Sequence, residues 1–358
     1  MTHIEKFQRE LKAGQAALIS SAQNIFYLSL FTYHDGYLLV LPDKAFLLTD
    51  FRYAEDAEHK ADRAFKVLCP KQTMLEAVRE LVRENGATTL LFEEDRLTVA
   101  ARDRLVKSLS DTGVTVTGGA GALLSRLRVL KDAQELAAMV RAQELTDAAF
   151  SHILSILTPT MREIDVALEL EYFMRREGAD GIAFSTIAVS GAASALPHGV
   201  PRNTVLEKGF LTMDFGARFG GYCADMTRTV VIGKADDGMK RLYNTVLKAQ
   251  QTALAMAAEG VSCRALDLAA RDVIDGAGYE GCFGHSLGHG VGIDVHEAPR
   301  LSAKAPADSV LERGHVVTVE PGIYQKGRYG CRIEDMIAVM PDGRLYNFTK
   351  STKELIEI

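Results

Sequence analysis

The carboxyl-terminal two-thirds of the chain contain two similar segments, and this repetition constrains the fold to two related halves. Residues 159–169 (PTMREIDVALE) resemble residues 260–270 (GVSCRALDLAA). In the same way LEKGFLTMD, which ends at Asp214, resembles LERGHVVTVE, which ends at Glu320. Self-similarity at a separation of about a hundred residues indicates duplicated supersecondary units. We therefore expect two copies of helix, loop and hairpin, related by a pseudo-twofold axis.

The first predicted hairpin carries two acidic residues on apolar strands. Its turn centres near Phe219 and Gly220, so an antiparallel register that folds there sets Asp214 opposite Asp225. Two carboxylates about 4 Å apart, at an effective dielectric constant near 20, repel each other by roughly 4 kcal/mol. The sequence therefore predicts a compensating positive charge beside this pair.

A second acidic pair, Glu320 and Glu334, repeats the arrangement around Gly327. If the two hairpins pack side by side, all four carboxylates come within reach of one cluster of divalent cations. The alternative is that these acids are solvated surface residues. The flanking segments LTMD, VVTVE and CRIE are more apolar than a typical exposed strand, which favours the cation cluster.

Histidines are concentrated between the two acidic pairs. His285, His289 and His296 lie in GHSLGHGVGIDVHEAPR, and His198 lies in ALPHGVP of the first repeat. The glycines of the longer segment make a helix poor and favour loop and strand. An imidazole beside four carboxylates would give a metal of borderline softness a nitrogen ligand. We therefore expect these histidines at the same site as the acids.

The segment Gly284 to Gly288 (GHSLG) offers a different hypothesis, because it matches the nucleophile elbow of serine hydrolases. Such an elbow needs a buried strand before the serine and a helix after it. Here DGAGYEGCFG precedes the serine and a glycine-rich run follows it. A serine hydrolase would also leave both acidic pairs unexplained.

Bulk composition limits the class of protein. With 358 residues, of which 47% are hydrophobic and 25% charged, the chain fits two ordinary globular domains. The net charge of −6 and the lack of a Lys/Arg block argue against nucleic acid or an anionic membrane as partner. No apolar run approaches about 18 residues, and the amino terminus lacks the apolar core of a signal peptide, so we expect a cytoplasmic protein. The five scattered cysteines predict neither a disulfide framework nor a thiolate metal site.

The chain divides into two predicted domains near the glycine-rich stretch at residues 118–121. Residues 1–124 alternate between apolar runs and helical patterns and predict a smaller α/β domain, in which Tyr33, His34 and Asp35 are interpreted as loop residues. Residues 125–358 predict an α+β domain with long helices beside the hairpins. Capping patterns predict helix starts at Thr73 with Glu76, at Asp132 with Glu135 and at Thr160 with Glu163.

The motifs MDFGARFGGYCADMTRT, GHSLGHGVGIDVHEAP, TVEPGIY and CRIED together resemble the pita-bread metallopeptidases. This family includes aminopeptidase P, prolidase and methionine aminopeptidase, with creatinase as a metal-free relative. The resemblance covers about residues 125–358 and implies a pita-bread (creatinase/aminopeptidase-like) catalytic domain with an internal pseudo-twofold. The preceding domain and TDFRYAEDA at residues 49–57 resemble aminopeptidase P and prolidase, which implies a creatinase-type amino-terminal domain and specificity for proline.

The resemblance implies two divalent metal ions and assigns their ligands. Asp214 corresponds to the bidentate ligand of one ion, and Asp225 and Glu334 correspond to bridging carboxylates. His289 and Glu320 correspond to the remaining ligands of the second ion. An oxygen-rich set suits Mn²⁺, and Co²⁺ or Zn²⁺ could also fill it. Because all five liganding types are present, a catalytically silent peptide-binding relative and a creatinase-like enzyme are disfavoured.

The resemblance also implies roles for residues that do not bind metal. His198 and His296 would be catalytic residues that hydrogen-bond the scissile carbonyl, together with Glu320 as the general base. Arg332 would lie behind the ligands and orient the acids. Substrate binding would involve His285, Arg300 and Tyr324, with Arg300 holding the free carboxylate of the substrate.

The expected function is that of a metal-dependent exopeptidase. It would hydrolyse the bond between an N-terminal residue and proline, in Xaa-Pro dipeptides or longer Xaa-Pro peptides, through a hydroxide bridging two metals. Its partners would be short proline-containing peptides and, as in relatives, a second copy of the chain in a homodimer. The choice between dipeptidase and aminopeptidase stays open at this point.

Overall fold

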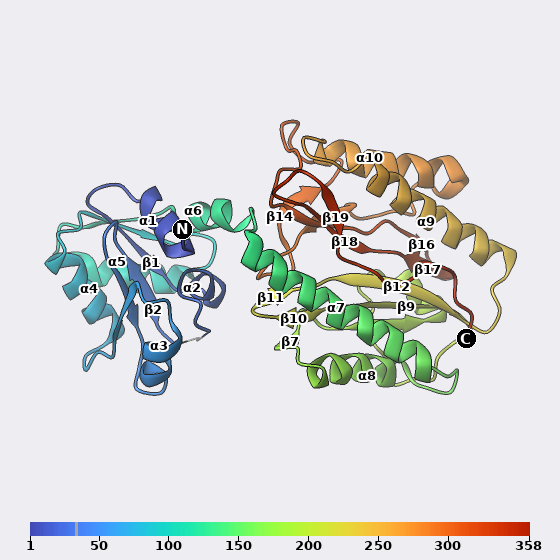
Figure 1. Cartoon of the computed structure of the whole chain (residues 1–358), viewed down its shortest axis with the longest axis horizontal. Coiled ribbons are helices and arrows are strands. Elements are labelled where there is room, and N and C mark those ends of the chain that lie inside the picture. Colours follow the sequence, from blue (N-terminus) through green and yellow to red (C-terminus); the bar gives the residue numbers. More distant parts are fainter. Residues whose placement is uncertain (33–34) are drawn as a thin grey trace. The chain divides into compact units, whose positions relative to one another are not determined.

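The computed structural model describes residues 1–32 and 35–358, so the predicted loop residues Tyr33 and His34 lie outside the described residues. The chain forms two compact units, Met1–Arg128 and Val129–Ile358 (Figure 1). Each unit has its own hydrophobic core.

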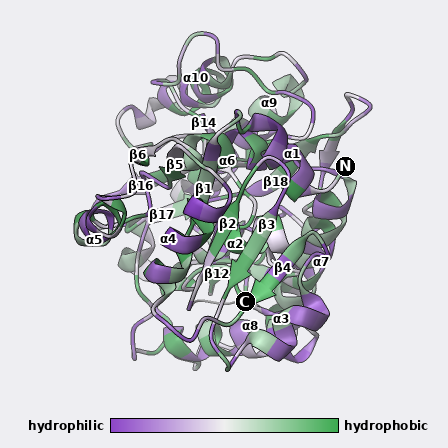
Figure 2. Ribbon diagram, turned by 90° about the vertical axis from the view of Figure 1, so that its left-hand side faces the viewer, coloured by the Kyte–Doolittle hydropathy of each residue, from purple (hydrophilic) through white to green (hydrophobic). Residues whose placement is uncertain are grey.

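Unit 1 is a mixed six-stranded sheet with the strand order β4-β3-β2-β1-β5-β6. β1 pairs antiparallel with β2 and parallel with β5. In Figure 2 the strands β2 and β3 are hydrophobic, whereas the helices α3 and α4 carry hydrophilic segments. The predicted capping box of Thr73 with Glu76 begins α4. The elements are α1 (His3–Glu10), β1 (Gln15–Ile19), α2 (Ala22–Ser29), β2 (Tyr37–Val40), β3 (Ala45–Leu48), α3 (Ala54–Lys60), β4 (Phe65–Leu68), α4 (Met74–Glu84), β5 (Thr89–Phe92), α5 (Val99–Leu109), β6 (Thr115–Gly118) and α6 (Ala120–Arg128).

Unit 2 consists of two helix pairs and several small antiparallel sheets. The strands β8, β9 and β12 form one sheet, β13, β14, β15, β18 and β19 form another, and β16 pairs with β17. Its elements are α7 (Ala133–Ile156), α8 (Glu163–Arg176), β7 (Gly181–Ile182), β8 (Ile187–Ser190), η1 (Gly191–Ala195), β9 (Gly209–Phe215), β10 (Ala217–Phe219), β11 (Tyr222–Cys223), β12 (Met226–Ile232), α9 (Asp237–Met256), α10 (Cys263–Ile274), η2 (Asp275–Tyr279), β13 (Gly288–Gly290), β14 (Glu297–Leu301), β15 (Val316–Val319), β16 (Gly322–Gln325), β17 (Tyr329–Arg332), β18 (Asp335–Val339) and β19 (Leu345–Asn347).

The predicted repetition of halves is confirmed in unit 2. In the first half the helix pair α7 and α8 precedes the antiparallel ladder β8-β9-β12, and in the second half α9 and α10 precede β13-β15-β18. Isolated bridges join Arg162 to Val205 in one half and Ser262 to Val310 in the other, at corresponding places. Figure 1 shows α7 and α8 along one side of these strands and α9 and α10 along the opposite side.

One of the predicted helix starts is wrong. The capping box of Asp132 with Glu135 begins α7 as expected. The next helix, however, has Arg162 as its N-cap, and Asp165 folds back to the backbone nitrogen of Arg162. Glu163 does not cap a helix with Thr160 because its carboxylate is bound by residues from elsewhere in the chain.

The register of the first acidic hairpin also differs from the prediction, because Asp214 pairs with Thr227 and not with Asp225. The turn consists of Gly220 and Gly221, which have positive φ values of 56° and 80° and therefore suit a tight hairpin. Asp225 precedes Thr227 by two residues and so lies diagonally across from Asp214 on the same face.

The second acidic hairpin has the predicted register. Val319 pairs with Asp335 in one ladder and Gly322 pairs with Arg332 in the next. The intervening residues Glu320 and Glu334 therefore lie opposite each other.

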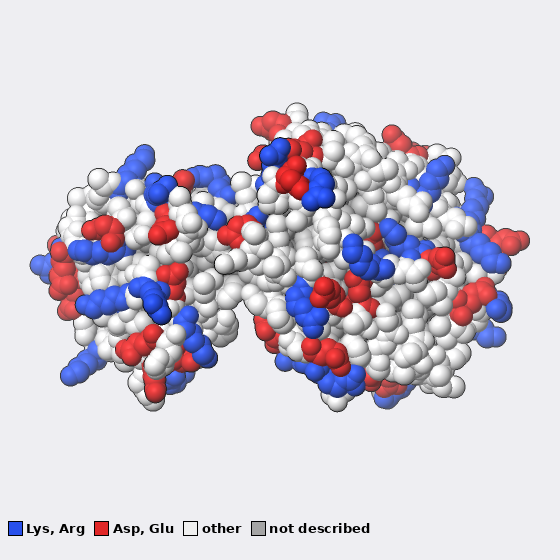
Figure 3. Space-filling view, viewed as in Figure 1, with Lys and Arg blue, Asp and Glu red and all other residues white. Residues whose placement is uncertain are grey.

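Two features of the structure concern nucleic acid and membranes, the partners that the sequence argues against. On the face shown in Figure 3, Lys and Arg side chains are interspersed with Asp and Glu side chains. Among the helices of residues 1–32 and 35–358, none combines the length and the apolar character that crossing a bilayer requires.

Candidate metal centre and active site

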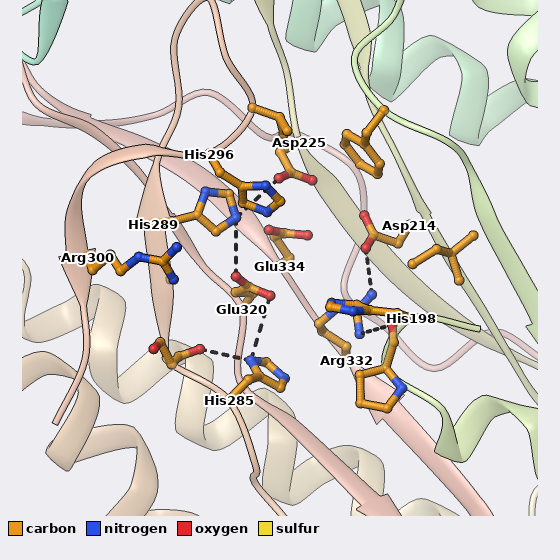
Figure 4. A pocket seen from close by; sticks show the side chains of 16 residues that line it. His198, Asp214, Asp225, His285, His289, His296, Arg300, Glu320, Arg332 and Glu334 are labelled. Atoms are coloured by element: carbon orange, nitrogen blue, oxygen red, sulfur yellow. Dashed lines mark hydrogen bonds and ion pairs between the residues drawn. The ribbon is translucent and has the colours of Figure 1, made fainter. Parts of the chain in front are cut away.

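All of the predicted site residues except Tyr324 line one pocket of unit 2, with a volume of about 500 Å³ (Figure 4). The four acids of the pocket lie at corresponding strands of the two halves. Asp214 lies near the end of β9, and Glu320 directly follows β15. Asp225 directly precedes β12, and Glu334 directly precedes β18. The predicted site residues that line the pocket are His198, Asp214, Asp225, His285, His289, His296, Arg300, Glu320, Arg332 and Glu334.

The acids at the bottom of this pocket are buried close together. Asp225, His289 and Glu334 each offer one ligand atom, and these atoms lie within 4.8 Å of one another. Burial, followed by the charge of Glu334, raises the pKa of Asp225 well above its ordinary value. Burial, followed by the charge of Glu320, does the same to the pKa of Glu334. Acids in such surroundings ionise together only when positive charge is added, which fits a site for cations.

One carboxylate oxygen of Asp214 has a hydrogen-bond partner among the described residues, and the other has none. Its Oδ2 atom accepts a hydrogen bond of 2.6 Å from Arg332. Its Oδ1 atom is buried and has no hydrogen-bond partner among the described residues. Because burying an unpaired polar atom is costly, the free oxygen indicates a ligand position.

His289 presents a lone pair to the acids. Its Nδ1 atom donates to the carbonyl oxygen of Gly290 at 3.1 Å, which leaves Nε2 unprotonated in the neutral ring. Nε2 lies 3.6 Å from Asp225 Oδ2 and 3.4 Å from Glu320 Oε1. Burial lowers the pKa of His289 to about 4, so the ring is neutral near pH 7. Neutral imidazole is the form that binds metals.

Arg332 connects the acids of the two halves. Besides Asp214 it binds the hydroxyl oxygen of Thr227 through Nε at 2.9 Å. The Thr227 hydroxyl in turn donates to Glu334 Oε2 at 2.7 Å. Sequence reasoning missed Thr227, although its place two residues after Asp225 on the same strand face could have indicated it.

Tyr324, a predicted substrate-binding residue, is not among the described residues that line the pocket. Its hydroxyl forms hydrogen bonds with both Arg332 and His285. The hydroxyl accepts from Arg332 at 2.8 Å and lies 2.9 Å from His285 Nε2. His285 Nδ1 donates to the carbonyl oxygen of Ser286, so the tyrosine hydroxyl donates to Nε2. Burial lowers the pKa of His285 to about 4, which keeps this ring neutral.

The remaining predicted residues are more exposed than the acids. His198, His296 and Arg300 are exposed residues at the pocket. The ring of His296 stacks edge-on against His289, with a centroid separation of 4.3 Å. The pocket therefore combines buried acids with exposed hydrogen-bond donors, which are the side chains of His198, His296 and Arg300.

Comparison with known proteins gives the family. Residues 137–341 match metallopeptidase family M24, and residues 3–130 match the creatinase/prolidase N-terminal domain. The chain belongs to metallopeptidase family M24. This membership confirms the predicted fold, a pita-bread catalytic domain preceded by a creatinase-type domain.

Several relatives of this M24 peptidase resemble it over nearly their whole length. The Xaa-Pro dipeptidase of Pyrococcus horikoshii is 34% identical over 346 residues, which is 95% of this chain and 94% of that protein. The structure of a Xaa-Pro dipeptidase from Bacillus anthracis has a TM-score of 0.93 and 39% identity, covering 99% of both chains. That of the X-Pro aminopeptidase from Thermotoga maritima has a TM-score of 0.90 and 35% identity, covering 98% and 99% of the respective chains.

The serine-hydrolase hypothesis does not fit this M24 structure. Ser286 lines the pocket but follows a loop, and the strand β13 comes after it. A nucleophile elbow has the opposite order, with the strand before the serine and the helix after it.

Proposed function

We propose that this M24 protein is a metal-dependent exopeptidase that hydrolyses the bond between an N-terminal residue and proline. Its substrates would be Xaa-Pro dipeptides or longer Xaa-Pro peptides. Two similar structures are those of a Xaa-Pro dipeptidase and an X-Pro aminopeptidase, which supports both substrate lengths. The observation that carries the proposal is the buried group of Asp225, His289 and Glu334 at an open pocket.

We assign two divalent ions to this site. The buried Oδ1 atom of Asp214, which has no hydrogen-bond partner among the described residues, and the raised pKa values of Asp225 and Glu334 support this assignment, because added positive charge would stabilise these donors. Four carboxylates would balance the charge of two dications. An oxygen-rich set suits Mn²⁺, with Co²⁺ and Zn²⁺ as alternatives. The proposed ligands are Asp214, Asp225, His289, Glu320 and Glu334.

Divalent ions in such a set activate water and polarise a carbonyl group. Glu320 would act as the general base, taking up a proton and passing it on. His198 and His296 would hydrogen-bond the carbonyl oxygen as negative charge develops on it. Arg300 would bind the free carboxylate of a dipeptide.

The substrate itself explains part of the pocket. A Xaa-Pro bond is a tertiary amide without an N–H group, so the site must hold a ring and later protonate its nitrogen. The apolar side chains of Phe184, Ile187 and Val295 line the same pocket and can contact such a ring. His285 and Tyr324 would support the site through their shared hydrogen bond.

The proposal is tested with protein stripped of metal by a chelator and reloaded with Mn²⁺, Co²⁺ or Zn²⁺. We expect Mn²⁺-dependent hydrolysis of Ala-Pro or Ala-Pro-Ala and much slower hydrolysis of Ala-Ala. A catalytically silent peptide-binding relative would bind these peptides in calorimetry and release no alanine after metal loading. That result would reject the peptidase.

We also propose that the protein acts as a cytoplasmic homodimer and binds neither nucleic acid nor membranes. Multi-angle light scattering at several protein concentrations tests the dimer. A monomer at every concentration would reject it.

A further inference from the structure

Glu163 and Asp267 are fully buried carboxylates of unit 2 that lie outside the proposed donor set. Glu163 is the first residue of α8, and Asp267 lies in α10. Both are 0% exposed, and neither is among the described residues that line the pocket. A buried carboxylate is costly unless its oxygens accept hydrogen bonds. The partners of each carboxylate therefore indicate what it holds in place.

Glu163 binds the segment that follows His198. Its oxygens accept from Arg202 Nε at 2.9 Å, from an Arg202 terminal nitrogen at 2.6 Å and from the Arg202 backbone nitrogen at 2.9 Å. The backbone nitrogen and the hydroxyl of Ser190 donate to the same carboxylate at 2.7 and 2.8 Å. Burial raises the pKa of Glu163, but these hydrogen bonds outweigh it and hold the pKa below its ordinary value. The carboxylate is therefore ionised at neutral pH.

The segment that precedes His198 is held separately. The carbonyl oxygen of Pro197 accepts a hydrogen bond from Arg332 at 3.3 Å. His198 thus lies between two fixed residues, Pro197 on the pocket side and Arg202 on the side of α8. The backbone is therefore held on both sides of His198.

In the second half, Asp267 binds the loop that carries His285. It accepts from the backbone nitrogen of Leu287 at 2.8 Å and from Arg271 at 3.1 and 3.3 Å. Arg271 donates to the carbonyl oxygens of Phe283 at 2.6 Å and of His285 at 3.0 Å. The loop that carries His285 is therefore fixed before, at and after the histidine.

We propose that Glu163 and Asp267 are positioning residues, each acting with an arginine to fix the loop that brings a histidine into the pocket. The two halves share one arrangement of different residues. A buried carboxylate on α8 or α10 binds an arginine, and the pair binds the backbone of a loop that carries a histidine. This inference rests on the proposed function for the catalytic value of His198, but the fixing of the loops can be measured without it.

The first test is Glu163→Gln, which keeps the side-chain volume and removes the charge. We expect kcat on Ala-Pro to fall about tenfold or more, because a small displacement of a catalytic group is costly, with a smaller change in KM. Bound Mn²⁺ per protomer should stay unchanged, because Glu163 contacts no proposed ligand. Amide hydrogen exchange should become faster in residues 196–206 and stay the same in residues 283–287.

The matched control is Glu207→Gln. Glu207 also binds Arg202, at 3.1 Å, but its side chain is 46% exposed. We expect kcat and exchange within twofold of the wild type. If Glu163→Gln does not fold, Arg202→Gln tests the same contact from the partly exposed side.

Asp267→Asn tests the second loop, with the exposed Asp272→Asn on the same helix as control. Faster exchange should now be concentrated in residues 283–287, and residues 196–206 should exchange as in the wild type. The inference is overturned if the Glu163 and Asp267 variants exchange like the wild type, or if the loss of kcat in Glu163→Gln follows loss of bound Mn²⁺. An inactive wild type would reject the proposed peptidase alone, because the exchange measurements would still decide whether the loops are held in this way.

Discussion

Replacing Thr227 with Val should weaken metal binding without removing any ligand. Thr227 is fully buried, and Val has nearly the same shape, so the change removes little more than the hydroxyl. That hydroxyl donates to Glu334 at 2.7 Å and accepts from Arg332 at 2.9 Å. Glu334 and Arg332 would each lose one hydrogen bond, and hydrogen bonds to charged groups contribute about 1.5–3 kcal/mol.

The loss of the bond to Glu334 acts directly on a proposed ligand. Residues behind metal ligands typically change metal affinity by about 10-fold to 100-fold, or roughly 1.4–2.7 kcal/mol. This range agrees with the loss of one charged hydrogen bond. We therefore expect the Mn²⁺ dissociation constant of Thr227→Val to rise about 10-fold to 100-fold in competition calorimetry.

Thr229→Val is the matched control for this prediction. Thr229 lies two residues further along β12 and is also buried, but its hydroxyl donates to the backbone oxygen of Arg332 and does not contact a proposed ligand. It should lower the free energy of unfolding and leave Mn²⁺ affinity within about twofold. Equal Mn²⁺ affinity in Thr227→Val and wild type, or equal weakening in both variants, would contradict the role assigned to the Thr227 hydroxyl.

Three further predictions concern single residues. His289→Ala should abolish turnover and leave the circular dichroism spectrum unchanged, and retained activity would reject His289 as a ligand. Arg300→Ala should raise KM for Ala-Pro far more than for Ala-Pro-Ala, whereas equal effects on both would argue against carboxylate binding. Burial, and then the charge of Lys131, lower the pKa of His315 to about 4, so below about pH 6.5 the unfolded chain binds a proton that the folded chain does not. The contribution of His315 to stability should fall by about 2 kcal/mol between pH 7 and pH 5, so stability measured by urea unfolding should depend less on pH in His315→Asn than in wild type.

The sequence predicted the proposed ligands and the family because these features depend on short motifs and on the internal repeat. The register around Gly327 was also predictable, since a single glycine marks the centre of that turn. The register around Gly220 was not, because Gly220 and Gly221 both have positive φ and the turn uses the pair. Shifting the assumed turn centre by one residue moved the predicted partner of Asp214 from Thr227 to Asp225.

Other features depended on contacts between distant segments. The start predicted for α8 failed because Glu163 binds Arg202 and Ser190, which local capping rules do not include. The role of Thr227 depends on Glu334, more than a hundred residues away in the chain. No local sequence pattern contains such a pairing.

The contacts that link the two halves have a consequence for cation preference. Arg332 of the second half binds Asp214 of the first, and Thr227 of the first binds Glu334 of the second. Farther from the pocket, Arg228 of the first half forms a buried ion pair with Asp335 of the second. A slight rotation between the halves would change the spacing of all four acids at once, and hence the ionic radius that they accommodate. Under the proposed assignment, selectivity between Mn²⁺ and the smaller Zn²⁺ would then be adjusted by substitutions at these contacts between the halves, with every proposed ligand unchanged.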